Sequence, residues 1–207
     1  MVDAYRLRSP LAHLGLAAQA GDDVDAGVVL SETPFRGLIN IRGNANDPAF
    51  VAAVKKATRL DIPTTPNTVS GKPATSRIFW LGPDEWMVVT KPGGGKRAFD
   101  ALWKNLKVDN LHASVADTSE ARTTIIVSGH GARNVMAKLC SLDLHPNKFG
   151  PSQCAQTIVA KVGVMLTQTA ETKTGGATFE LYPLRSFSTY LWKRLEDAAN
   201  EYGVQIV

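Results

Sequence analysis

Two segments of the chain join a short run of β-branched residues to a helical pattern, and the two segments resemble each other. Residues 37–43 read GLINIRG and residues 123–129 read TTIIVSG, so each is predicted to be a strand closed by glycine. After each run, apolar residues recur at spacings of three and four, which predicts an amphipathic helix. These residues are Phe50, Val51, Val54 and Ala57 after the first run, and Ala132, Val135, Met136, Leu139 and Cys140 after the second.

The patterns that follow also correspond, although the second half carries an additional strand. In the first half, two predicted strands precede a helix with an apolar stripe; in the second half, three strands precede a helix. The strands are 76–81, 85–90, 155–160, 163–169 and 178–184, and the second helix lies within 186–203. Each half is therefore roughly strand–helix–strand–strand–helix. Gly43 and Gly129 lie 86 positions apart (129 − 43), so we interpret the pattern as an internal duplication.

Units of this kind place helices on one face of a mainly antiparallel sheet, so the predicted fold class is α+β. We expect an irregular N-terminal segment over 1–36 with one possible strand at 27–32, a first repeat over 37–116 and a second over 117–207. Together they are expected to form one compact domain. Residues 61–75, rich in Pro, Thr, Ser and Gly, are predicted to form a long loop that is functional or faces a partner.

The stretch WLGPDEWMVV (80–89) places Asp84 and Glu85 between two tryptophans. Paired carboxylates beside aromatic side chains can act as an acid and a base, because an apolar wall raises one pKa and leaves the other low. Gly-Pro-Asp-Glu is also a good turn sequence between two strands. We interpret the stretch as a structural hairpin with both carboxylates at its exposed tip, and we expect no catalytic residue on this chain.

Composition narrows the function classes. Of 207 residues, 44% are hydrophobic and 20% charged, and the formal net charge is +4, as in an ordinary globular protein. The basic residues are scattered, so no nucleic-acid partner is expected. No apolar run approaches the roughly 20 residues that span a bilayer, so no membrane association is expected. The N-terminal sequence lacks a signal-peptide pattern, and we expect a cytoplasmic protein.

Few other residues suggest chemistry. KPGGGKR (91–97) fails the spacing of a phosphate-binding loop; we interpret it as a strand-to-helix joint, with a surface anion site at the helix N-terminus left open. No histidine or cysteine pair has metal-ligand spacing, so no metal site is expected. Cys140 is predicted to lie in the core, and a disulfide with Cys154 is possible by count but not expected in a reducing compartment. Asp117, in VADTSEARTT (115–124), either caps a turn or contacts a polar ligand.

Several long stretches resemble the γ subunits of heterotetrameric sarcosine oxidases, in the same order over nearly the whole chain. They are SPLAHLGL, FRGLINIRG, IFWLGPDEWMVV, VADTSEARTTIIVSG, AKLCSLDLHP, FGPSQCAQTIVAKVGVML and FELYPLRSFSTYLWKRLEDAANEYG. The resemblance implies a fold related to the folate-binding domain of the glycine-cleavage aminomethyltransferases. The acidic folate contact of those enzymes maps only loosely, with Asp117 as the nearest candidate.

The resemblance also implies a complex. Such an oxidase converts sarcosine to glycine with oxygen and tetrahydrofolate, giving hydrogen peroxide and a one-carbon unit. This chain would be its non-catalytic γ subunit, with α, β and δ subunits as partners. FAD, FMN, NAD, zinc and tetrahydrofolate would be held by those other subunits. Two alternatives are the corresponding subunit of a related N-methyl amine dehydrogenase, such as one acting on N-methylglutamate, and a free-standing folate-dependent transferase.

Overall fold

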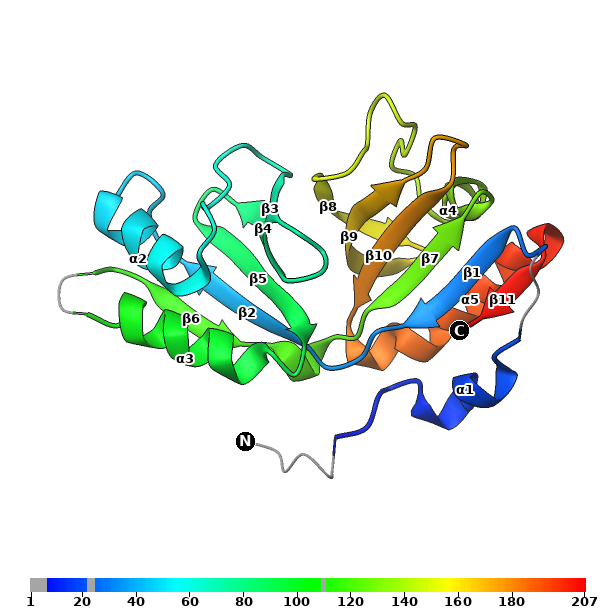
Figure 1. Ribbon diagram of the computed structural model, residues 1–207, viewed down its shortest axis with the longest axis horizontal. Coiled ribbons are helices and arrows are strands. Elements are labelled where there is room, and N and C mark those ends of the chain that lie inside the picture. The colour runs from blue at the N-terminus through cyan, green and yellow to red at the C-terminus, as the bar shows by residue number, and fades with distance from the viewer. Residues whose placement is uncertain (1–6, 22–24, 109–110) are drawn as a thin grey trace. The chain divides into compact units, whose positions relative to one another are not determined.

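The computed structural model describes residues 7–21, 25–108 and 111–207 (Figure 1). Within these residues the chain forms two compact units, each built on one sheet. The unit that we call the five-stranded unit comprises Phe35–Ala121 and Pro151–Gln156. The six-stranded unit comprises the described residues up to Pro34, together with Arg122–Gly150 and Thr157–Val207. The combination of sheets and helices in these units confirms the predicted α+β class.

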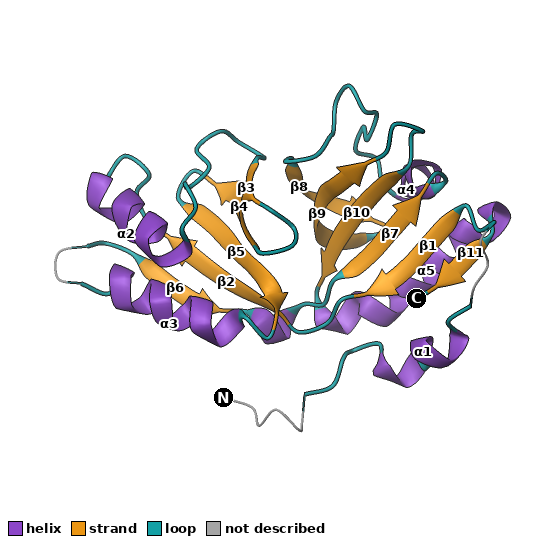
Figure 2. Ribbon diagram, viewed as in Figure 1, coloured by secondary structure: helices purple, strands orange, loops and turns teal. Residues whose placement is uncertain are grey.

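The five-stranded unit carries an antiparallel sheet with two helices packed on it (Figure 2). The helices are α2 (Pro48–Thr58) and α3 (Gly95–Leu106), which also contact each other. In spatial order the strands are β3 (Val69–Gly71), β4 (Ser76–Gly82), β5 (Glu85–Pro92), β2 (Arg36–Arg42) and β6 (Ser114–Asp117). The 3-10 helix η3 (Ser119–Ala121) follows β6.

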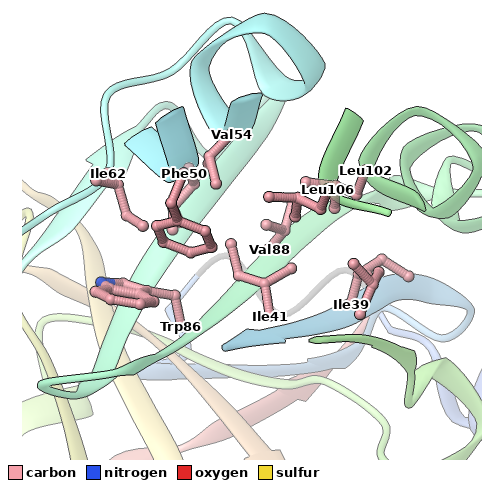
Figure 3. Close-up of a cluster of buried hydrophobic side chains, with 11 residues drawn as sticks. Ile39, Ile41, Phe50, Val54, Ile62, Trp86, Val88, Leu102 and Leu106 are labelled. Carbon is pink, nitrogen blue, oxygen red and sulfur yellow. The ribbon is translucent and has the colours of Figure 1, made fainter. Parts of the chain in front are cut away.

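Side chains from both helices and from the central strands form the core of this unit (Figure 3). Phe50 and Val54 from α2 and Leu102 and Leu106 from α3 are fully buried, as the predicted apolar stripes require. They pack with strand residues that share one face of the sheet, among them Ile39, Ile41, Trp86 and Val88.

In the six-stranded unit β1 pairs with β11 in parallel, whereas the β1–β7, β7–β10 and β10–β9 pairs are antiparallel. The strands run in the order β11 (Val204–Ile206), β1 (Val28–Glu32), β7 (Ile125–Gly129), β10 (Ala177–Pro183), β9 (Val162–Glu171) and β8 (Cys154–Val159). Its helices are α1 (Leu16–Gln19), α4 (Ala132–Leu139) and α5 (Ser188–Ala199), with 3-10 helices η2 (Ala12–Leu14), η4 (Arg185–Phe187) and η5 (Asn200–Tyr202).

Local sequence explains the start of α2. Asp47 is the N-cap, and its carboxylate accepts a hydrogen bond of 2.8 Å from the backbone N–H of Ala49. Pro48 stands at the first helical position, where its missing N–H costs nothing. The strand before the helix ends beside Gly43, where an added Cβ would lie 2.3 Å from the Phe50 ring. Gly43, which closes the first predicted strand, is therefore needed for close packing of the helix.

Each unit includes a strand from outside the strand–helix–strand–strand–helix pattern that the sequence predicted, namely β6 in the five-stranded unit and β1 in the six-stranded unit. In the five-stranded unit β2 lies between β5 and β6, and in the six-stranded unit β7 lies between β10 and β1. The strand β6 lies at the end of the first predicted repeat and pairs with β2 of that repeat. The strand β1 precedes the first repeat but pairs with β7 of the second. The units therefore have different borders from 37–116 and 117–207, and the expectation of one compact domain stays a prediction.

Two parts of the chain are more ordered than their composition indicates. The loop predicted over 61–75 contains the strand β3 and the buried side chain of Ile62. The segment 1–36 contains β1, as its possible strand predicted, and Leu11 is fully buried. No helix in the described ranges is long and apolar enough to cross a lipid bilayer.

Candidate functional site

The WLGPDEWMVV hairpin gives its two carboxylates different surroundings. The strands β4 and β5 pair as predicted, with Pro83 and Asp84 at the turn. Asp84 is exposed, whereas Glu85 accepts hydrogen bonds from Asn40 Nδ2 at 2.7 Å and Arg42 Nη2 at 2.6 Å. The expectation that both carboxylates lie at an exposed tip thus holds for Asp84 but not for Glu85, which is half-buried because the antiparallel register brings Arg42 opposite it.

Asp84 also lines a cavity of about 610 Å³ at this end of the five-stranded unit. The other polar side chains in its lining are Arg42, Asn44, Asn46, His112 and Ser114. Arg42 already binds Glu85 at the edge of the cavity. Sequence reasoning missed this grouping, because His112 lies far from the hairpin in the chain and reaches it only through the β2–β6 pairing.

Asp117 ends β6, and its carboxylate is bound into the turn that follows. Its Oδ1 accepts hydrogen bonds from the Ser119 backbone N–H at 3.0 Å and from Ser119 Oγ at 2.5 Å. Ser119 Oγ in turn accepts a hydrogen bond of 3.0 Å from the Leu38 N–H. These contacts tie the end of β6 to β2, and a ligand contact for Asp117 stays a prediction.

A second polar cluster lies around Arg122 and Thr123, the first residues of VADTSEARTT that belong to the six-stranded unit. Arg122 donates a 2.7 Å hydrogen bond to the Tyr182 carbonyl, and burial lowers the pKa of its guanidinium from the ordinary value. Thr123 Oγ1 donates to Glu32 at 2.5 Å, and Ser9 Oγ also donates to Glu32. Glu32 was not a sequence candidate, since it lies 91 residues from Thr123 and meets it only through the β1–β7 pairing.

With this geometry in place, the chain can be compared with known proteins. The family model described as "Sarcosine oxidase, gamma subunit family" matches residues 42–201. The chain belongs to the sarcosine oxidase gamma subunit family.

Members of this gamma subunit family match almost the whole chain. The sarcosine oxidase subunit gamma of Corynebacterium sp. (strain U-96) is 29% identical over 98% of this chain and 95% of its own length. The subunit from Corynebacterium sp. (strain P-1) is 30% identical over 97% of this chain and 93% of its own length. In a solved heterotetrameric sarcosine oxidase from Corynebacterium sp. U-96, one chain matches with a TM-score of 0.83 and 28% identity, covering 97% of this chain and 98% of that one.

Aminomethyltransferases share the fold of the gamma subunit. The glycine cleavage system aminomethyltransferase T of Bartonella henselae matches with a TM-score of 0.67 and 18% identity, over 95% of this chain and 58% of that chain. This likeness shows the fold alone and confirms the expected relation. An aminomethyltransferase of Saccharopolyspora erythraea is 28% identical over 96% of this chain, which spans about half of that relative (54%).

The remaining sequence candidates of this gamma subunit are the two cysteines and the segment 91–97. Cys140 and Cys154 are free and buried, and burial raises the pKa of the Cys154 thiol to about 12. The Cys154 thiol is therefore protonated and poorly reactive at neutral pH. Within the ranges that the structure describes, no group of three or more His, Cys, Asp or Glu side chains could hold a metal ion. Residues 91–97 form the strand-to-helix joint that the sequence predicted, between the end of β5 and the start of α3.

Proposed function

We propose that this chain is the non-catalytic gamma subunit of a heterotetrameric sarcosine oxidase and that it supports assembly of the complex. The observation that carries this proposal is the match to a chain of the heterotetrameric enzyme over 97% of this sequence, with a TM-score of 0.83. The complex would oxidatively demethylate sarcosine to glycine with oxygen and tetrahydrofolate, releasing hydrogen peroxide and a one-carbon unit.

In this proposal the partners are the α, β and δ subunits, in the cytoplasm. FAD, FMN, NAD, zinc and tetrahydrofolate are bound by those subunits and not by this one. The surroundings of the gamma-chain carboxylates support a structural role: Glu85 is held by Arg42, and Asp117 by Ser119.

The test is purification of a tagged gamma chain from its native host, with identification of stoichiometric partners by mass spectrometry. We expect three further subunits, a yellow complex and sarcosine-dependent release of hydrogen peroxide. The same chain produced alone is expected to be colourless and inactive. A flavin that stays with the isolated chain, or a sarcosine-active complex that lacks the chain, would contradict the proposal.

Two related functions remain alternatives that the same preparation separates. A complex that prefers another N-methyl amine, such as N-methylglutamate, and reduces an acceptor other than oxygen would be a sister dehydrogenase. The similarity to the Saccharopolyspora aminomethyltransferase favours, as a second candidate, a folate-dependent transferase. Titration of the isolated chain with tetrahydrofolate distinguishes this candidate, because only a transferase is expected to bind folate without partners.

A further inference from the structure

The five-stranded unit contains a cavity of about 510 Å³ whose charged lining is entirely basic. Its walls come from the C-terminal end of α2, the β3–β4 turn, the end of β5 and one face of α3. The lining residues are Lys56, Ala57, Thr58, Arg59, Ala74, Thr75, Ser76, Val88, Thr90, Lys91, Gly94, Arg97, Ala98, Ala101 and Asn105. Its volume lies within the range of about 300–1,000 Å³ that is typical of small-molecule sites.

Four cationic side chains from three elements surround this cavity, and within the described residues none of them forms an ion pair. They are Lys56, Arg59, Lys91 and Arg97. Neighbouring lysines are neutralised: Lys55 lies 2.7 Å from Asp61, and Lys96 lies 2.5 Å from Asp100. The cations that face the cavity thus differ from those beside them by lacking an acidic partner.

Helix polarity accounts for only part of this arrangement. Basic residues near the C-terminus of α2, such as Lys56, are favoured by the negative end of the helix dipole. Arg97 is in the first turn of α3, where the dipole is positive, and that turn contains no acidic residue. Arg97 is therefore disfavoured by the positive end of its own helix. An anion bound in the cavity would remove this conflict.

The cavity also contains neutral polar groups beside the cations, most of which already donate to backbone carbonyls: Thr58 to Val54, Thr90 to Lys91 and Asn105 to Ala101. Hydroxyls of Thr58, Thr75, Ser76 and Thr90 and the amide of Asn105 lie in its lining, while Val88 and four alanines supply apolar surface. Its position is fixed by the close approach of α3 to β2: a Cβ on Gly37 would lie 2.3 Å from Gly95 Cα. The Gly37 N–H also donates a 3.1 Å hydrogen bond to buried Thr90 Oγ1. The walls are therefore held in place without a ligand.

We propose that this cavity is a binding site for a small organic anion that carries at least two carboxylate or phosphate groups. The four cations neutralise and orient the ligand, and the alanine surface accommodates its carbon skeleton. The proposal does not depend on the identity of the complex to which the chain belongs. It also gives a role to KPGGGKR (91–97), whose sequence left an anion site open.

The experiment is calorimetric titration of the full-length chain with inorganic pyrophosphate and, separately, with citrate, in chloride buffer at constant ionic strength. We expect saturable binding of at least one probe at one site per chain. Preference for pyrophosphate indicates a phosphate-bearing ligand, and preference for citrate indicates a polycarboxylate. If neither probe binds saturably, the proposal is wrong.

Two variants test the location of the site. Arg97→Gln is expected to weaken binding by about tenfold or more, the loss of one charge-assisted hydrogen bond. Arg59→Gly should do the same with its backbone undisturbed, because Arg59 has φ 65°, a left-handed conformation that glycine favours. Lys104→Gln, a control on α3 outside the cavity, should leave binding unchanged. Equal binding by Arg97→Gln and Lys104→Gln would overturn the proposal.

A second measurement separates a ligand site from a partner contact. The titration is repeated on the purified complex, with lysine labelling of Lys91 as a readout of access. Retained binding with Lys91 accessible supports the small-ligand site. Loss of binding together with protection of Lys91 would show that an acidic segment of another subunit fills the cavity, and the small-ligand proposal would then be wrong.

Discussion

Trp86 connects the hairpin to the core of the five-stranded unit. Its ring is fully buried, with its centroid 5.7 Å from that of Phe50, and its Nε1 donates a 2.8 Å hydrogen bond to the Pro63 carbonyl. The ring therefore anchors α2 and the segment after it to β5. Because the indole N–H has a partner, its burial leaves no polar group unsatisfied.

We predict that Trp86→Ala lowers the free energy of unfolding by about 3–5 kcal/mol, since it leaves a large cavity and an unpaired carbonyl. The measurement is urea denaturation followed by circular dichroism. Trp103→Ala is the control: this tryptophan is 47% exposed on α3, and its loss should cost less than about 1 kcal/mol. Similar losses in the two variants would show that Trp86 contributes no more than a surface residue.

At the scale of elements, sequence patterns predicted the strands and helices well and the pairing of distant strands poorly. Spacings of three and four located α2 and α4, and Asp47-Pro48 marked the start of α2. Composition alone assigned 61–75 to a loop, but the edge of β4 provides backbone partners for the short strand β3. Glu85 was misjudged for the same reason, because its partner Arg42 is set by strand register, which the local sequence does not specify.

The β2–β5 ladder makes a testable prediction at the hairpin. The Arg42–Glu85 pair is partly solvated, with side chains 55% and 27% exposed, so its coupling energy should be only about 0.2–1 kcal/mol. A double-mutant cycle with Arg42→Gln and Glu85→Gln measures this quantity. Asp84→Asn, at the exposed tip, should change stability by less than about 0.5 kcal/mol. If Asp84→Asn and Glu85→Gln instead abolished turnover of a normally assembled complex, the acid–base interpretation of these two carboxylates would be correct.

An ion pair between α4 and η5 should make stability depend on pH. Lys138 Nζ binds the Glu201 carboxylate and also lies 4.5 Å from the Tyr202 ring centroid. The hydrogen bond to Lys138 lowers the pKa of Glu201, and the same bond raises the pKa of Lys138. The Glu201 carboxylate thus stabilises the folded chain at pH values above its ordinary pKa of about 4.3, and this stabilisation is lost as the pH falls through the lowered pKa. Lys138 contributes below about pH 10.4, and its contribution is lost as pH rises further.

We therefore predict that Lys138→Met destabilises the chain by a constant amount between about pH 5 and pH 9, and that the difference shrinks below about pH 4. Urea unfolding of wild type and variant across this range measures it. Lys193→Met, at an exposed position on α5, is the matched control and should show no such pH dependence. A difference that persists unchanged to pH 3 would exclude the ion pair as its cause.

At the scale of the whole molecule, the sequence indicated two similar units but not the strands that flank β2 and β7. Gly43 and Gly129 closed similar patterns, yet nothing near them indicates that β1 pairs with β7 and β6 with β2. Local patterns carry information about elements, whereas these pairings depend on contacts between distant segments. The same limit applies to the candidate sites, since the basic cavity unites residues from α2, β5 and α3 that are far apart in sequence.

The last prediction concerns assembly. Apolar residues such as Leu11, Phe35 and Leu38, together with the loop 61–75, predict from sequence that segments 1–36 and 61–75 contact the large subunits. Residues 1–6 and 22–24 of the first segment lie outside the described residues. Leu11 and Leu38 no longer support that expectation, because they are buried within the chain, but Phe35 is 41% exposed. Leu184, Phe187 and Tyr190 form a second group of exposed apolar side chains at the start of α5.

Permanent interfaces bury about 2,000 Å² or more and are more apolar than the average surface, so such side chains should be covered on assembly. Hydrogen exchange on the free chain and on the complex should therefore show new protection in 7–21, 61–75 and 184–190. Segments in the interior of β9 and β10, already buried in the free chain, serve as the internal control. If those three segments exchange equally in both states while protection rises elsewhere, the gamma subunit meets its partners through a different surface.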